Sequence, residues 1–200
     1  MRYKLPLVLL CLLLVITVSA HAQQFDMAFG VSMVTAPSAS AATGNFTPQT
    51  IGGGTYVGFS GDYLFVHNFG VQGEINWRAS QNLYGGNQPF RPLFIDFNGI
   101  CVPHVSERVQ PEFKAGLGVA SVRFYTPTFT CDFFSGSCTN YDTRNHFMGD
   151  LGAAVRLYVH GHIFVRPEAQ VYLIHNNVEF SSGHAERLGV SIGYTFGSQY

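Results

Sequence analysis

The sequence predicts an all-β fold, an eight-stranded antiparallel up-and-down barrel preceded by a cleaved signal peptide. Two observations carry this prediction. Beyond Gln24, hydrophobic residues recur at every second position in eight separate segments, and no helical period is sustained. The composition agrees, because 18 Phe, 10 Tyr and 22 Gly favour strands and turns over helices.

The first residues have the pattern of a secretory signal. Arg2 and Lys4 precede an apolar run that ends at Ala20, and Ala20-His21-Ala22 forms a small-x-small cleavage site. The run is on the short side for a membrane-spanning helix, which needs about 18 apolar residues or more. We therefore expect residues 1–22 to be removed and residues 23–200 to form one barrel domain.

The eight alternating segments give the expected strands in chain order. They are residues 25–33, 57–65, 69–78, 93–98, 110–119, 147–157, 163–173 and 187–196. The second segment has two exceptions to the alternation, Tyr56 and Leu64. Three prolines, Pro103, Pro111 and Pro167, lie in or beside these segments, and inner strands resist proline, so we expect bulges or bends there.

The connections alternate in length. Residues 67–68, 106–108 and 160–162 are short turns, whereas residues 35–50, 80–89, 126–144 and 179–184 are longer connections. Short turns at one end of a meander and long loops at the other are typical of barrels in the bacterial outer membrane. An even number of strands then places both termini at the end with the short turns, on the periplasmic side.

The apolar faces are expected to point outward, towards lipid, which makes the barrel transmembrane. An eight-stranded barrel has an interior only wide enough for one filling of side chains, and the apolar faces carry too much volume for it. A soluble barrel would also need a charged exterior. Lys114 is the single lysine that follows the signal segment, and charged residues make up only 12% of the sequence.

Charged residues on the opposite faces are then expected to share the interior. These residues are Asp26, Asp62, Glu74, Arg78, Asp96, Glu112, Lys114, Asp150, Arg156, Arg166, Glu168 and Arg187. A charge in a narrow, poorly hydrated space must be paired or hydrogen-bonded. We expect ion pairs between strands that close the barrel to solutes, with six of these residues at mid-height: Glu74, Glu112, Lys114, Arg156, Arg166 and Glu168.

The cysteines suit an exported protein. Cys131 and Cys138 bracket a small Gly-containing loop and could close a local disulfide in an oxidising compartment. Cys101 is left over and is interpreted as a small apolar filler.

Other chemistry is weakly indicated. A net charge of −1 argues against a nucleic-acid partner. His67, His104, His160 and His162 gather at turns and are interpreted as turn residues, with no metal expected. A hydrolase would need a serine, a histidine and an acid together, and His175 with Glu179 and Ser181 or Ser182 is a conceivable cluster whose geometry nothing fixes. The expectation is that the protein is not an enzyme and has no cofactor.

The chain resembles the small outer-membrane β-barrel family that includes the OmpA transmembrane domain, OmpX and the opacity-type proteins. The signal segment, the eight alternating segments and the aromatic C-terminal end carry this resemblance. It implies that the end of the chain is an assembly signal read by the barrel-insertion machinery, and that outer-membrane lipid surrounds the barrel. The residues of this signal are Ile192, Gly193, Tyr194, Phe196 and Tyr200.

The expected role is structural, or surface interaction through the extracellular loops. These loops carry the aromatic residues Tyr84, Phe129, Phe133, Phe134 and Tyr141. One alternative is a soluble exported barrel of the lipocalin type, which would bind an apolar small molecule inside. Another is a narrow diffusion channel. Detergent dependence separates the first alternative from a membrane barrel, and conductance tests the second.

Overall fold

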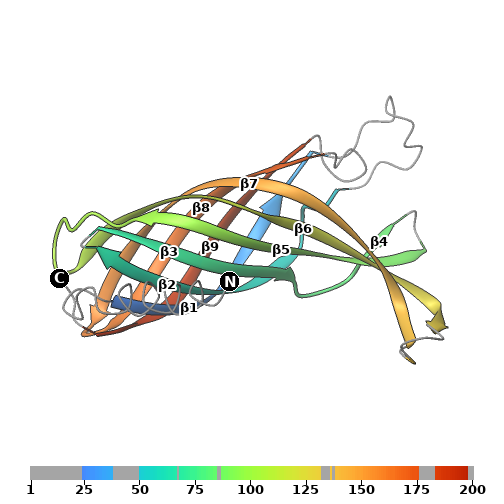
Figure 1. Cartoon of the computed structure of the whole chain (residues 1–200), viewed down its shortest axis with the longest axis horizontal. Coiled ribbons are helices and arrows are strands. Elements are labelled where there is room, and N and C mark those ends of the chain that lie inside the picture. Colours follow the sequence, from blue (N-terminus) through green and yellow to red (C-terminus); the bar gives the residue numbers. More distant parts are fainter. Residues whose placement is uncertain are drawn as a thin grey trace, which may run out of the picture.

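The computed structural model describes residues 24–37, 50–66, 68–84, 87–131, 136, 138–175 and 183–197. The expected signal segment, residues 38–49 of the predicted first long connection, and Tyr200 lie outside these residues. The described residues form nine β-strands (Figure 1). They are β1 (Gln24–Thr35), β2 (Thr55–Val66), β3 (Phe69–Arg78), β4 (Asn82–Tyr84), β5 (Gln88–Cys101), β6 (Val109–Cys131), β7 (Cys138–His160), β8 (Ile163–Ile174) and β9 (His184–Phe196). None of the described elements is a helix long and apolar enough to cross a membrane.

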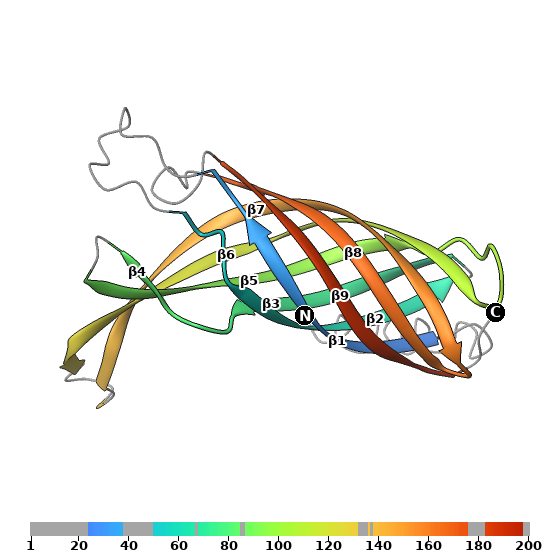
Figure 2. The ribbon, with the colours of Figure 1, turned by 180° about the vertical axis from the view of Figure 1, so that it is seen from behind.

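Eight of these strands close into one antiparallel ring. Each strand pairs with its neighbour along the chain, β3 pairs with β5, and β1 pairs with β9 from Phe25–Phe196 to Thr35–Glu186. The short β4 lies outside the ring and pairs with β5 alone. Figures 1 and 2 show the strands inclined around a common axis. The eight predicted strands are therefore the ring strands, and β4 is the one element that the alternation did not predict.

The large apolar side chains point out of the ring. Phe97, Leu117 and Ile192 are each at least 60% exposed, whereas Asp96, Gln72 and Arg156 on the opposite faces are buried. A band of apolar side chains around a closed antiparallel barrel is the surface that a bilayer requires. The soluble alternative needed these side chains inside, so the burial pattern contradicts it.

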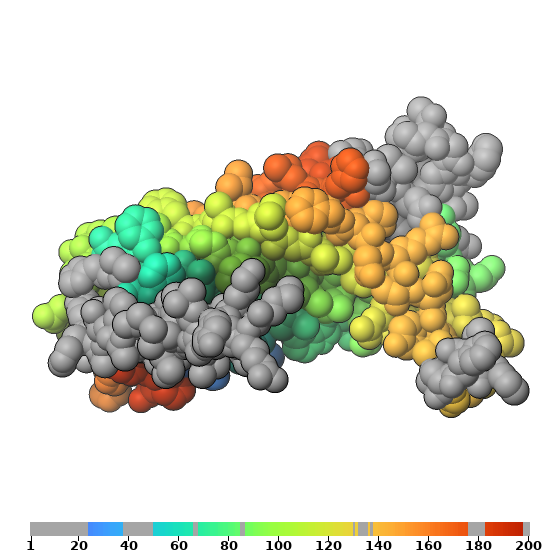
Figure 3. Space-filling model, viewed as in Figure 1, coloured from blue at the N-terminus to red at the C-terminus, as the bar shows by residue number. Residues whose placement is uncertain are grey.

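The β6–β7 hairpin projects beyond the rest of the barrel (Figures 1 and 3). Both strands have 23 residues, and their pairing extends through Tyr125–Tyr141, with an irregular step, to Cys131–Cys138. A disulfide joins the two cysteines. The expectation of a long loop over residues 126–144 is therefore wrong, because most of that segment continues the two strands.

The other connections follow the predicted asymmetry with one difference. The sequence positions between β2 and β3, and those between β7 and β8, are as few as predicted, whereas β5 and β6 are joined by residues 102–108, a longer segment than predicted that contains Pro103. Pro111 pairs with Val155 in an unbroken register, so the expected bulge is absent from this described pair. Beside Pro167 the β7–β8 pairing is interrupted, and the register is the same on both sides.

Candidate functional site

The interior of the ring holds the candidate site, a layer of buried charged side chains contributed by seven strands. Asp26 comes from β1, Asp62 from β2 and Glu74 from β3, while Glu112 and Lys114 come from β6. Arg156 lies on β7, Arg166 and Glu168 on β8, and Arg187 on β9. The two-residue period of each strand turns these side chains inward, and the ring closure brings their ends together across the barrel.

Arg156 is the centre of the first group of ion pairs. Its Nη2 lies 2.9 Å from Asp62 Oδ2 and its Nε lies 2.7 Å from Glu112 Oε2. Its Nη1 pairs with Asp26. One guanidinium therefore connects four strands, β7 with β1, β2 and β6. Three carboxylates around one buried cation need the further positive charge that the next arginine supplies.

Arg166 joins this first group to the rest of the layer. Its Nη1 lies 3.0 Å from Asp62 Oδ2 and 3.5 Å from Glu112 Oε1. Its Nη2 donates to Ser60 Oγ at 2.7 Å and lies 3.8 Å from Glu168 Oε2. Arg166 thus shares two carboxylates with Arg156 and touches a third that belongs to the second group.

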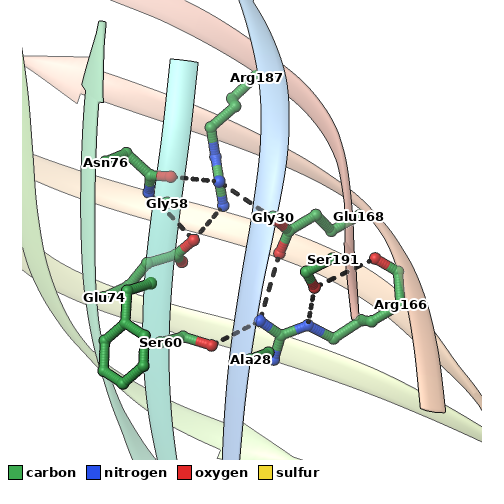
Figure 4. A pocket seen from close by; sticks show the side chains of 11 residues that line it. Ala28, Gly30, Gly58, Ser60, Glu74, Asn76, Arg166, Glu168, Arg187 and Ser191 are labelled. Carbon is green, nitrogen blue, oxygen red and sulfur yellow. Dashed lines mark hydrogen bonds and ion pairs between the residues drawn. The ribbon is translucent and has the colours of Figure 1, made fainter. Parts of the chain in front are cut away.

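The second group surrounds Glu74 and Glu168. Lys114 Nζ lies 2.7 Å from Glu74 Oε2 and 3.5 Å from Glu168 Oε2. Arg187 Nη2 lies 2.6 Å from Glu74 Oε1, and its Nη1 lies 3.2 Å from Glu168 Oε1. Arg187 also donates to Asn76 Oδ1, and Figure 4 shows the side chains of Arg187, Asn76, Glu74 and Glu168 pointing towards one another across the barrel.

Three predicted members of the charged network lie inside the barrel without an ion pair among the described residues. Asp96 accepts a hydrogen bond of 2.6 Å from Asn98, and Asp150 accepts one of 2.9 Å from Gln170. Arg78 is 8% exposed, and its Nε and Nη1 have no hydrogen-bond partner. The structure therefore brings together nine residues of the predicted set: Asp26, Asp62, Glu74, Glu112, Lys114, Arg156, Arg166, Glu168 and Arg187.

Amide and hydroxyl groups complete the layer, and sequence reasoning missed them. Gln72 donates to Glu112 and accepts from Lys114 and Asn98, so one amide links three strands. Ser60 and Ser191 are acceptors for Arg166. The available signal was their place on the inward face, at the same alternating positions as the charges.

Little space remains inside the charged layer. The gap lined by Ser60, Glu74, Arg166 and Arg187 has a volume of about 10 Å³ (Figure 4). That volume is at the lower limit for one water molecule. The layer is therefore filled by its own side chains.

Apolar side chains fill the barrel on both sides of the charged layer. Towards the projecting hairpin lies the upper apolar layer, defined by Val34, Ile51, Tyr56, Phe90, Phe94, Ala120, Val122, Phe124, Met148, Tyr172, Ile174 and Ala185. The rings of Phe94 and Tyr172 stack at 4.8 Å, and Tyr56 packs on Phe94. At the opposite end two smaller groups are buried, one with Tyr158 and Phe164 and the other with Leu64, Ile100 and Val102.

The C-terminal strand has a packing role besides any role in assembly. Ile192, Tyr194 and Phe196 are exposed on the outer face, and Phe196 lies near Phe25 across the β1–β9 seam. Gly193 faces inward beneath the ring of Phe164, where an added Cβ would lie 2.2 Å from Phe164 Cζ. An aromatic ring over a cross-strand glycine is a device that stabilises curved sheets.

Neither metal chemistry nor hydrolysis gains support from the described residues. They contain no group of three or more His, Cys, Asp or Glu side chains placed to hold a metal ion. The histidine cluster suggested by the sequence includes His67, and the hydrolase cluster includes Glu179, Ser181 and Ser182; all four lie outside the described residues.

Comparison with known proteins places this geometry among membrane barrels. Residues 8–196 match the family model described as the outer membrane protein beta-barrel domain. Neisserial surface protein A has 10% sequence identity and a TM-score of 0.59, over 87% of this chain and 97% of that chain. A major outer membrane protein from Thermus thermophilus has 12% identity and a TM-score of 0.56, over 88% of this chain and 100% of that chain.

A third similar structure is Ail, the attachment invasion locus protein of Yersinia pestis. It has 12% identity and a TM-score of 0.53, over 88% of this chain and 99% of that chain. A search of curated proteins returned no match. At these identities the structural likeness concerns the fold.

Proposed function

Since the chain belongs to the outer membrane protein β-barrel domain family, and so resides in the bacterial outer membrane, we propose that it is a closed, non-enzymatic barrel that displays a rigid hairpin at the cell surface. The filled interior is the single observation that carries this proposal. Four buried cations and five carboxylates interlock at mid-barrel: Lys114, Arg156, Arg166, Arg187, Asp26, Asp62, Glu74, Glu112 and Glu168. A solute would have to separate these pairs and also displace the stacked rings of Phe94 and Tyr172.

The surface role rests on the β6–β7 hairpin. In this family the short turns face the periplasm, so the hairpin projects outward from the cell. Its end is cross-linked by the Cys131–Cys138 disulfide, and it presents the exposed side chains of Phe129 and Tyr141. Two similar structures are named as a surface protein and an attachment protein, and the attachment protein was solved in complex with a heparin analogue.

The C-terminal strand is the proposed point of contact with the assembly machinery. Tyr194 and Phe196 alternate on the outer face of β9, and β9 forms the last seam of the ring with β1. An exposed aromatic strand edge that remains unpaired until closure is a suitable template for another protein's strand.

Electrical recording tests the closed interior. The folded protein is identified by its heat-dependent mobility on a gel. It is then inserted into a planar lipid bilayer. The expected result is a current equal to that of the protein-free bilayer. Steady, reproducible openings would contradict the proposal and would favour the diffusion channel instead.

A further inference from the structure

Two arginines lie side by side on the outer face of the barrel, near the end from which the hairpin projects. Arg91 on β5 and Arg123 on β6 are direct cross-strand partners. Their neighbours Phe90 and Phe124 are buried inside, so the alternation turns both arginines outward. Like charges directly opposite each other destabilise a sheet, so this pair requires a compensating partner.

No carboxylate among the described residues forms an ion pair with either arginine. The Nε atoms of Arg91 and Arg123 are buried and lack a hydrogen-bond partner. Arg91 Nη2 makes one long bond of 3.4 Å to Ala79 O, and the guanidinium of Arg123 lies 5.2 Å from the centre of the Tyr141 ring. The buried Nε atoms are out of reach of an external group, so the donors that suit the oxygens of a phosphate are the terminal Nη atoms of the pair.

The depth of the pair matches the headgroup level of the outer leaflet. Successive outward rows on a strand are about 7 Å apart along its length. The next row towards the membrane centre contains Leu93 and Ser121, and the row after it contains Ile95 and Val119. Ile95 and Val119 begin the exposed apolar band, so the two guanidinium groups lie just beyond the hydrocarbon region.

A groove adjoins the arginine pair on the side away from the membrane centre. It has a volume of about 480 Å³ and is lined by Asn87, Gln88, Pro89, Tyr125, Thr126 and Pro127. Pro89 and Tyr125 are the next outward residues after Arg91 and Arg123 along their strands. A tyrosine ring and two prolines beside a few amide and hydroxyl groups are a lining typical of small-molecule sites.

We propose that Arg91 and Arg123 bind the phosphate of a phosphorylated glycolipid of the outer leaflet, whose sugar occupies the adjoining groove. Charge complementarity selects an anionic group, and the outward direction of both side chains selects a molecule that lies in the membrane. The acyl chains of such a lipid would pack on Ile95 and Val119, two rows closer to the membrane centre. This site depends on the membrane orientation of the barrel and is independent of whether the interior conducts.

The chain has a built-in reporter for this site. Trp77 is the single tryptophan of the sequence, and it pairs across strands with Leu93, the next outward residue after Arg91. The folded protein in neutral detergent is titrated with a diphosphorylated, acylated glucosamine disaccharide while Trp77 fluorescence is recorded. The same lipid without phosphates and inorganic phosphate alone are titrated in parallel.

The expected result is a saturable fluorescence change with the phosphorylated lipid, and roughly tenfold weaker binding for each of Arg91→Gln and Arg123→Gln, because each removes charge-assisted hydrogen bonds. Arg108→Gln is the matched control, since Arg108 is exposed near the opposite end of the barrel. It should bind as the wild type does. Folding of each single variant is checked by heat-dependent mobility.

Three outcomes would overturn the proposal. The first is equal binding by the wild type and both single variants. The second is an equal loss in Arg108→Gln, which would show general attraction to charge. The third is saturation by inorganic phosphate at the same concentration as the lipid, which would identify free phosphate as the ligand.

Discussion

At the scale of single residues, the interior depends on buried side chains that share their charged partners. Arg166 contacts Asp62, Glu112 and Ser60, and all of these groups are buried. Removing one member of a buried charged group leaves the others desolvated and uncompensated. The loss in free energy of unfolding is therefore set by the buried charges that remain, more than by the contact that is lost.

The first prediction concerns Arg166. Arg166→Ala should lower the free energy of unfolding by about 3–5 kcal/mol, because two carboxylates lose one of their cations inside the barrel. Urea titration of the protein in lipid vesicles measures this change. Arg108→Ala, at an exposed arginine, should remain within about 0.5 kcal/mol of the wild type. An unchanged urea midpoint for Arg166→Ala would refute the role of the ion pairs.

The second prediction concerns Gly193, which also belongs to the expected assembly signal. Gly193→Ala should destabilise the barrel by about 1–3 kcal/mol, because the new methyl group meets the ring of Phe164. Refolding of purified protein into vesicles, without any assembly machinery, isolates this packing effect. Gly73→Ala is the control, since a Cβ there has no neighbour within 4 Å. Wild-type stability of Gly193→Ala would leave the assembly role as the only explanation for this glycine.

At the scale of elements, alternation predicted the strands well and their extensions poorly. Residues 126–144 contain Pro127, Gly136 and many polar residues, which are typical of loops, yet β6 and β7 extend into the segment as far as Cys131 and Cys138 and pair again at their ends. Tyr56 and Leu64 were noted as exceptions to the alternation. They belong to the apolar layers inside the barrel, so the exceptions marked real inward positions.

The sequence could not predict which charged residues of the layer pair with one another. The period of two turns Arg156 and Asp26 inward, but only the register and shear of the closed ring bring β7 opposite β1. For the same reason Asp96, Asp150 and Arg78 were grouped with the ion pairs, although none of the three forms an ion pair among the described residues. Phe94 and Tyr172 were missed because apolar neighbours on both sides hide an inward apolar residue.

The third prediction concerns the disulfide at the end of the β6–β7 hairpin. Beyond Tyr125–Tyr141 the only cross-strand pairs among the described residues are Thr130–Thr139 and Cys131–Cys138, so the cross-link limits fraying there. Replacing both cysteines by serine should speed amide hydrogen exchange at Thr130 and Thr139, with exchange in the barrel part of β6 unchanged. Cys101→Ser is the control. Unchanged exchange at both threonines would show that the hairpin is held without the disulfide.

At the scale of the whole molecule, the barrel is arranged opposite to a soluble protein. Charged groups lie at the centre, apolar layers lie above and below them, and the outermost shell is apolar. Val190 illustrates the outer shell, because it is exposed near the middle of β9 and pairs with Val31 and Pro167.

The fourth prediction tests this arrangement in a bilayer. Val190→Lys should cost about 2–4 kcal/mol, because it places a charge near the midplane of the hydrocarbon region. His184→Lys, at the exposed outer end of the same strand, should cost about 0–1 kcal/mol. Both values come from urea titration in vesicles. Equal costs at the two positions would mean that lipid does not surround β9 as described.

The pairing of β1 with β9 imposes an order of events on the cell. β1 finds its second neighbour only in β9, so a chain interrupted before His184 leaves two open edges however well the intervening hairpins have formed. Closure thus requires that the chain has been synthesised and exported through β9. A nascent barrel must be shielded throughout this interval, because its two unpaired strand edges are templates for aggregation.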